Sequence, residues 1–110
     1  FFGRILQEYL ESYYVVCYTL LPKKRVQIQK KDLLTEIRKN GVKMYHTGEI
    51  MLSESLSLPN YTNALSLLRS EKALLEQQVG KKNIIIELIN QEKVEILFEK
   101  IKIYLDGIRA

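Results

Sequence analysis

Apolar residues recur along most of the chain at the spacing of an α-helix, and the first such stretch is the longest. Nine of them fall three or four positions apart between Phe2 and Leu20, which makes one continuous stripe on a helix. Pro22 follows, and the residue before a proline is disfavoured in helical geometry. The pattern therefore predicts one long helix over residues 2–21.

A second helix is predicted to pass through a glycine. Gly41 falls in register with the apolar Ile37 and Met44, so we expect the helix to continue through it and to end at Gly48. The pair Asn40-Gly41 is also typical of a helix C-terminus, and a shorter helix that ends there is the alternative.

The second half of the chain changes from helical to strand periodicity and back. A short helix around Met51–Ser57 is followed by a helix that starts at Leu58-Pro59, because proline is favoured in the first helical turn. Residues 74–79 and 83–89 are two short runs on either side of a Gly-Lys-Lys turn, the second rich in β-branched residues, and they predict a hairpin. Asn90 can cap a last helix.

These elements predict a mainly α fold, a helical domain with a winged-helix-like core of three helices plus a β-hairpin. A long N-terminal helix and a C-terminal helix flank this core. The 110 residues are the size of one domain. Because Phe1 already belongs to an amphipathic pattern and no initiator Met precedes it, we expect a fragment of a longer chain. The residues expected at the centre of the core are Leu6, Leu10, Cys17, Ile37, Leu65, Leu68, Ile85, Leu97 and Ile101.

The positive charge is concentrated in one predicted connection. The net charge is +4, and residues 22–31 hold five basic side chains and no acid, so the remainder sums to −1. A nucleic-acid binder with a uniformly basic surface is not expected from this distribution. Asp32 is predicted to end the connection as N-cap of the second helix. The basic residues could contact anionic lipid, dock another domain, or form a solvated loop with no specific role; they are Lys23, Lys24, Arg25, Lys30 and Lys31.

No complete catalytic or metal site is visible in the sequence. His46 is the single histidine, and no cysteine cluster accompanies it to bind a metal. Cys17 lies on the apolar stripe and is expected to be a core thiol. Glu49 and Glu54 could pair as acids, but charges at a helix start on a solvated surface explain them better. We therefore assign no catalytic residue, no metal ligand and no cofactor.

Four short motifs resemble one protein family. They are Leu10-Glu11-Ser12-Tyr13, Gly48-Glu49-Ile50, Glu54-Ser55-Leu56-Ser57 and Asn63-Ala64-Leu65. Together they resemble the C-terminal region of the glycerol-3-phosphate and dihydroxyacetone-phosphate acyltransferases, which follows the catalytic domain. The resemblance runs from about Phe2 to Leu75.

The resemblance implies an accessory domain that does not catalyse the reaction itself. The family's catalytic pair is a His followed after four residues by an Asp, in which the His is the general base and the Asp orients it. Here His46 is followed at that spacing by Met51. Residues 1–110 are thus expected to be a single non-catalytic C-terminal domain. The parent would transfer an acyl group from acyl-CoA or acyl carrier protein to glycerol 3-phosphate or dihydroxyacetone phosphate.

The same resemblance implies the partners. We expect the domain to pack through its first helix on the catalytic acyltransferase domain of the parent chain, in a protein held peripherally at an intracellular membrane surface. The alternative is a winged-helix module that binds nucleic acid or protein. Nucleic acid is disfavoured because the helix near Pro59–Arg69 has few basic residues, although Lys81 and Lys82 lie in the wing.

Overall fold

The computed structural model describes residues 2–23 and 27–109. These residues form a mainly helical domain with a small antiparallel sheet, which confirms the predicted helical domain with a β-hairpin. In chain order the elements are α1 (Phe2–Leu20), β1 (Gln27–Gln29), α2 (Lys30–Thr47), η1 (Ser53–Ser55, a 3₁₀-helix), α3 (Leu58–Ser70), β2 (Leu74–Val79), β3 (Asn83–Leu88) and α4 (Gln91–Arg109).

Three of the predicted helix ends are confirmed, those marked by Gly48, Pro59 and Asn90. Helix α2 runs through Gly41 and stops at Gly48, which takes the left-handed conformation (φ 85°) that glycine adopts without a steric penalty. Helix α3 starts beside Pro59, and the Ser57 hydroxyl accepts a hydrogen bond from a backbone N–H of the first turn. The Asn90 side chain caps α4 by accepting from Lys93 N at 3.2 Å.

The prediction that residues 22–31 form a connecting loop throughout was wrong at their C-terminal end. Gln27–Gln29 form strand β1, which pairs antiparallel with β3 and gives the sheet the order β1-β3-β2. Helix α2 then begins at Lys30, so Asp32 lies in its first turn and is not the N-cap. A three-residue strand is too short for a periodic apolar signal, and β1 forms because it satisfies backbone groups on the open edge of β3.

The short helix expected around Met51–Ser57 is smaller than predicted. Only Ser53–Ser55 are helical, as one 3₁₀ turn. The chain on either side is extended, which brings the segment across α1.

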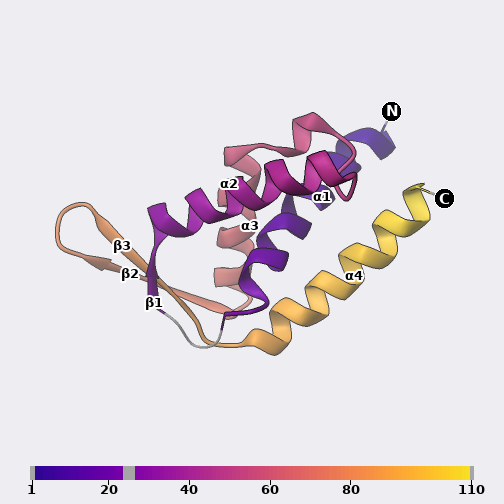
Figure 1. Ribbon diagram of the computed structural model, residues 1–110. Coiled ribbons are helices and arrows are strands. Elements are labelled where there is room, and N and C mark those ends of the chain that lie inside the picture. The colour runs from indigo at the N-terminus through magenta and orange to yellow at the C-terminus, as the bar shows by residue number, and fades with distance from the viewer. Residues whose placement is uncertain (1, 24–26, 110) are drawn as a thin grey trace.

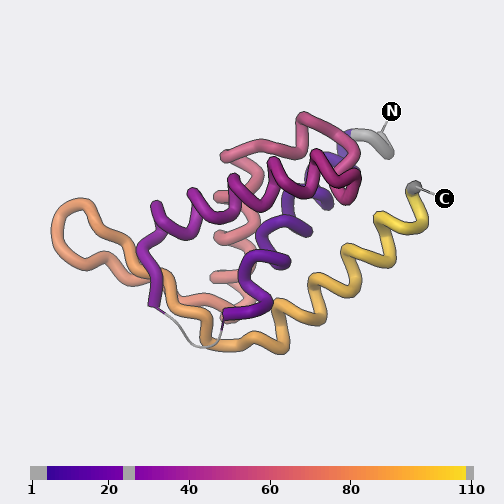
Figure 2. The backbone as a smooth tube through the Cα atoms, viewed as in Figure 1, coloured from indigo at the N-terminus to yellow at the C-terminus, as the bar shows by residue number. Residues whose placement is uncertain are grey.

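Helix α1 lies at the centre of the domain and is contacted by α2, α3 and α4 (Figure 1). The rings of Tyr14 and Phe98 stack between α1 and α4 with centroids 4.7 Å apart. The Gln91 side chain donates a hydrogen bond to the Leu21 carbonyl, which ties the start of α4 to the end of α1. The hairpin projects at one end of the 45 × 24 × 24 Å molecule, and α1 begins and α4 ends at the other (Figure 2).

Most of the predicted core lies inside. Cys17, Ile37, Leu65, Leu68 and Ile101 are buried, whereas Leu10, Ile85 and Leu97 are half-buried. Leu6 is 49% exposed, so its placement in the core was wrong. Within the part of the chain that the structure describes, no helix is both long enough and apolar enough to cross a bilayer.

Candidate functional site

A buried carboxylate joins α1 to the segment that precedes α3. Glu11 is fully buried, and its two oxygens accept hydrogen bonds from Met51 N at 2.9 Å, Leu52 N at 3.0 Å and Ser55 Oγ at 2.8 Å. The Gln7 amide donates a further bond to it at 3.3 Å. A buried ionisable group is tolerated only when hydrogen bonds replace its water, and Glu11 meets that condition.

The neighbouring serine extends the same cluster. Ser12 Oγ lies 2.6 Å from the Ser55 carbonyl oxygen, to which it donates, and accepts from the Asn60 amide at 3.3 Å. Like Glu11, Ser12 is fully buried. These four residues, Glu11, Ser12, Ser55 and Asn60, form a polar clamp that holds η1 and the start of α3 on α1. Because Glu11, Ser12 and Ser55 are closed off from solvent, the clamp is a positioning element and not a site for substrate.

The clamp gives a structural role to two of the four motifs. Two of them contribute its polar atoms, Glu11 and Ser12 from the first and Ser55 from the third, and Gly48 starts the turn that leads to Met51. Sequence reasoning named the motifs without a role for Glu11. In the sequence, Glu11 is an acid beside an apolar stripe. Apolar periodicity alone predicts that such a residue is exposed to solvent.

The residues considered as candidates for a catalytic or metal site are not brought together in one site. Cys17 is buried, and burial raises the pKa of its thiol to about 12, so the reactive thiolate is suppressed at neutral pH. His46 is exposed, with its ring 6.0 Å from that of Tyr45. Among residues 2–23 and 27–109, no group of three or more His, Cys, Asp or Glu side chains is arranged to hold a metal ion.

The candidate basic residues are dispersed, and part of their charge is compensated. Lys23 pairs with Glu36 at 2.9 Å. Lys30 pairs with Glu76 at 3.3 Å, and the same carboxylate contacts Arg69 at 3.3 Å. Lys31 is exposed in the first turn of α2. Lys24 and Arg25 lie outside the described residues.

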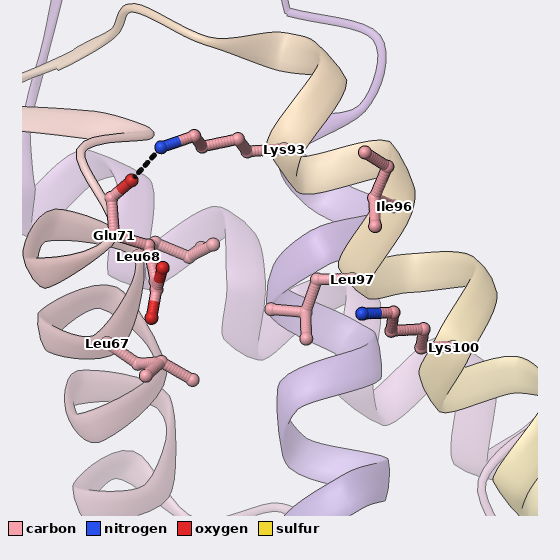
Figure 3. A pocket seen from close by; sticks show the side chains of 7 residues that line it. All are labelled: Leu67, Leu68, Glu71, Lys93, Ile96, Leu97 and Lys100. Atoms are coloured by element: carbon pink, nitrogen blue, oxygen red, sulfur yellow. Dashed lines mark hydrogen bonds between the residues drawn. The ribbon is translucent and has the colours of Figure 1, made fainter.

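An apolar groove separates α3 from α4. Leu67 and Leu68 of α3 face Ile96 and Leu97 of α4 across a cavity of about 300 Å³ (Figure 3). Two lysines of α4, residues 93 and 100, and Glu71 complete the lining. Lys93 Nζ donates to the Glu71 carbonyl at 2.6 Å and bridges one end of the groove.

Large apolar side chains are exposed at the end of the molecule where α1 begins and α4 ends. On α1 the exposed residues are Ile5, Leu6 and Tyr9, and on α4 they are Ile103, Tyr104 and Ile108. The two most exposed are Ile103 at 70% and Tyr104 at 64%. We call these six residues the apolar end.

Comparison with known families decides the identity of this arrangement. The family model of the glycerol-3-phosphate acyltransferase C-terminal region matches residues 1–77. The chain belongs to this family. It is therefore part of a glycerol-3-phosphate acyltransferase, and the resemblance carried by the four motifs is confirmed. No curated protein and no solved structure matches the chain.

The family match covers the polar clamp completely and the sheet in part. It includes α1, α2, η1 and α3 and ends inside β2. Strand β3 and helix α4 lie beyond it, although β3 is the central strand and α4 packs along α1.

Proposed function

We propose that this chain is the accessory C-terminal domain of a glycerolipid O-acyltransferase whose catalytic domain belongs to another part of the parent protein. That domain would transfer the acyl group from acyl-CoA or acyl carrier protein to glycerol 3-phosphate or dihydroxyacetone phosphate. The absent His–Asp pair supports the assignment, because His46 has Met51 at the position where the Asp should be. The clamp contains a buried carboxylate, but that carboxylate is closed to substrate.

The apolar end is the observation that carries a docking role. Six large apolar side chains, three in the first half of α1 and three in the second half of α4, are exposed toward one end of the molecule. Several exposed large apolar side chains at one end of a domain are typical of an interface. We propose that the catalytic domain of the parent covers this end, so that α1 and α4 together brace it.

We further propose a peripheral position at an intracellular membrane surface. The acyl products of this chemistry are amphiphiles, and exposed lysines such as Lys31 and Lys82 give the domain an attraction to anionic lipid. The side of the domain that carries these basic residues would contact the anionic membrane surface.

The core topology supports a winged-helix-like arrangement, but not a nucleic-acid role. We propose that β1, α2, α3 and the hairpin form this core, with β1 completing the sheet. In a DNA-binding winged helix, α3 would present basic side chains. Its exposed positions Asn63, Ser66 and Ser70 are neutral, and Arg69 is engaged with Glu76. A winged helix used for protein contact agrees with the docking role.

Acidic substitutions at the apolar end of the parent enzyme test the docking role. Leu6→Asp together with Tyr104→Asp should abolish acyl transfer, because burying unpaired carboxylates at an interface costs several kcal/mol. Tyr18→Asp is the matched control, since Tyr18 is 45% exposed on the same helix but lies outside the apolar end. Wild-type activity in the double variant, with the control also active, would rule out docking through this end.

A further inference from the structure

The structure brings together basic residues that are far apart in the sequence. Where α2 starts beside the hairpin, a pocket of about 190 Å³ is lined by Lys30, Lys31 and Leu34 from α2 and by Lys82, Asn83 and Ile84 from the hairpin, with Gln29 between strand and helix. None of these lining residues is acidic. Figure 1 shows the first turn of α2 beside the hairpin, on the side away from the chain ends. We call this the basic pocket.

The lysines of the basic pocket differ in how their charge is balanced. Lys30 is held by Glu76, which also contacts Arg69, so its charge is compensated. Lys31 and Lys82 are exposed, and their ammonium groups form no ion pair or hydrogen bond with any other described residue. Two uncompensated cations beside one cavity repel each other, and an anion between them removes that repulsion.

We propose that the basic pocket binds a phosphate group. A phosphate offers two negative charges and several acceptor oxygens, which suit two ammonium groups and the amide donors of Asn83. The pocket is smaller than the roughly 300 Å³ at which sites for whole organic ligands begin, so it suits a head group. Leu34 and Ile84, both half-buried, offer an apolar side to the carbon chain that follows the phosphate. The site is separate from the apolar end and does not depend on docking there.

The phosphate ester can come from a lipid head group or from a water-soluble metabolite. For the lipid arm, the 110-residue chain is sedimented with phosphatidylcholine vesicles that contain phosphatidic acid, and with phosphatidylcholine alone. We expect binding only to the first. Lys31→Gln with Lys82→Gln should weaken it about 30-fold or more, because each change removes a charge-assisted hydrogen bond to the phosphate that contributes about 1 kcal/mol or more.

A charge-matched variant separates the pocket from general attraction. Lys39→Gln with Lys43→Gln removes two exposed lysines from the same helix, and neither lines the basic pocket. In this variant the affinity for the vesicles should fall by less than about 3-fold, because neither lysine would contact the phosphate. An equal loss in both variants would overturn the proposal, because binding would then follow net charge alone. Melting temperatures should stay unchanged, since exposed lysines contribute little to stability.

For the soluble arm, glycerol 3-phosphate and inorganic phosphate are titrated while backbone amide signals are followed. Shifts of the Lys31, Lys82 and Asn83 amides that saturate, and that vanish in the Lys31/Lys82 variant, support the pocket and identify a soluble source. Binding in the vesicle arm only identifies a lipid source. No binding in either arm, or tighter binding of a short DNA duplex through the same lysines, would overturn the proposal.

Discussion

The two halves of α1 carry the same apolar stripe, but they differ in how far neighbouring elements bury them. From Glu11 to Leu20, Tyr18 is the only exposed residue. Before Glu11, Ile5, Leu6 and Tyr9 are all more than 40% exposed. The C-terminal half is almost wholly buried, whereas Ile5, Leu6 and Tyr9 in the N-terminal half are left uncovered. The difference teaches that periodicity identifies an apolar face without showing what covers it.

The enclosed half of α1 contains buried polar residues. Glu11, Ser12 and Thr19 are all buried and all hydrogen-bonded, while Ile5, Leu6 and Tyr9 of the open half are exposed. Thr19 Oγ1, for example, accepts from the Asn40 amide of α2 at 2.9 Å. Buried polar groups with complete partners specify one arrangement of the helices around α1. In the open half, the described side chain of Gln7 donates to Glu11, and Ile5, Leu6 and Tyr9 stay exposed.

The largest effect should come from removing the carboxylate of the enclosed half. Glu11→Ala leaves the buried Ser55 hydroxyl and the half-buried N–H groups of Met51 and Leu52 without their charged acceptor and should lower the free energy of unfolding by roughly 3–5 kcal/mol. Urea denaturation measures it. Glu95→Ala, at an exposed position of α4, is the control and should change stability by about 0.5 kcal/mol or less. A similar small change for Glu11→Ala would mean that the clamp does not hold α1.

A matched pair of leucines on α1 tests the contrast directly. Leu20 is 1% exposed and Leu6 is 49% exposed. Leu20→Ala should cost about 2–5 kcal/mol, as large-to-small changes in a core do. Leu6→Ala should cost about 0.5 kcal/mol or less, because little apolar area returns to water. Equal costs in the isolated chain would show that both halves of the helix are buried in solution.

A smaller effect is expected where α2 and α3 approach each other beside the enclosed half. A Cβ at Gly41 would lie 2.4 Å from Tyr61 Oη, so Gly41→Ala should cost about 1–3 kcal/mol through overpacking. Tyr61 Oη is buried without a hydrogen-bond partner among the described residues, and burial raises the pKa of its phenol to about 12. Tyr61→Phe alone should therefore be neutral or stabilise by up to about 1 kcal/mol.

Combining the two changes checks the cause of that effect. In the Tyr61→Phe background the clashing oxygen is gone, and the next Tyr61 atom, Cζ, is 3.5 Å from the added Cβ. Gly41→Ala should then cost clearly less than in the wild type, a coupling that thermal or urea denaturation of the four proteins measures. Additive costs would place the strain elsewhere, for example at Leu56 Cδ2, 3.2 Å from the same Cβ.

Elements with a local cause were predictable, and elements with a distant cause were not. Gly48, Pro59 and Asn90 act through their own backbone geometry or side chains, and the helix ends they mark are confirmed. Strand β1 depends on a partner strand almost sixty residues away, with Ile28 opposite Ile86. Pairing with β3 makes Gln27–Gln29 a strand, although the sequence alone predicted a loop there.

The candidate site shows the same division. The four motifs led to the family, and the family match confirms it, but nothing local showed that Glu11 and Ser12 would meet Ser55 across the fold. The basic segment was visible as a run of charge. Among its described lysines, Lys23 pairs with Glu36 and Lys30 with Glu76, while Lys31 lines the basic pocket together with Lys82.

The sequence by itself determined the four long helices and the hairpin, because caps, proline geometry and apolar periodicity act over one or two turns of chain. It also determined the family, through motifs that can be read in order. Only the tertiary structure decided which half of α1 is covered, which acid is buried and which lysines share a cavity. These outcomes depend on which elements pack together, and contacts between residues distant in the chain leave no trace in local spacing.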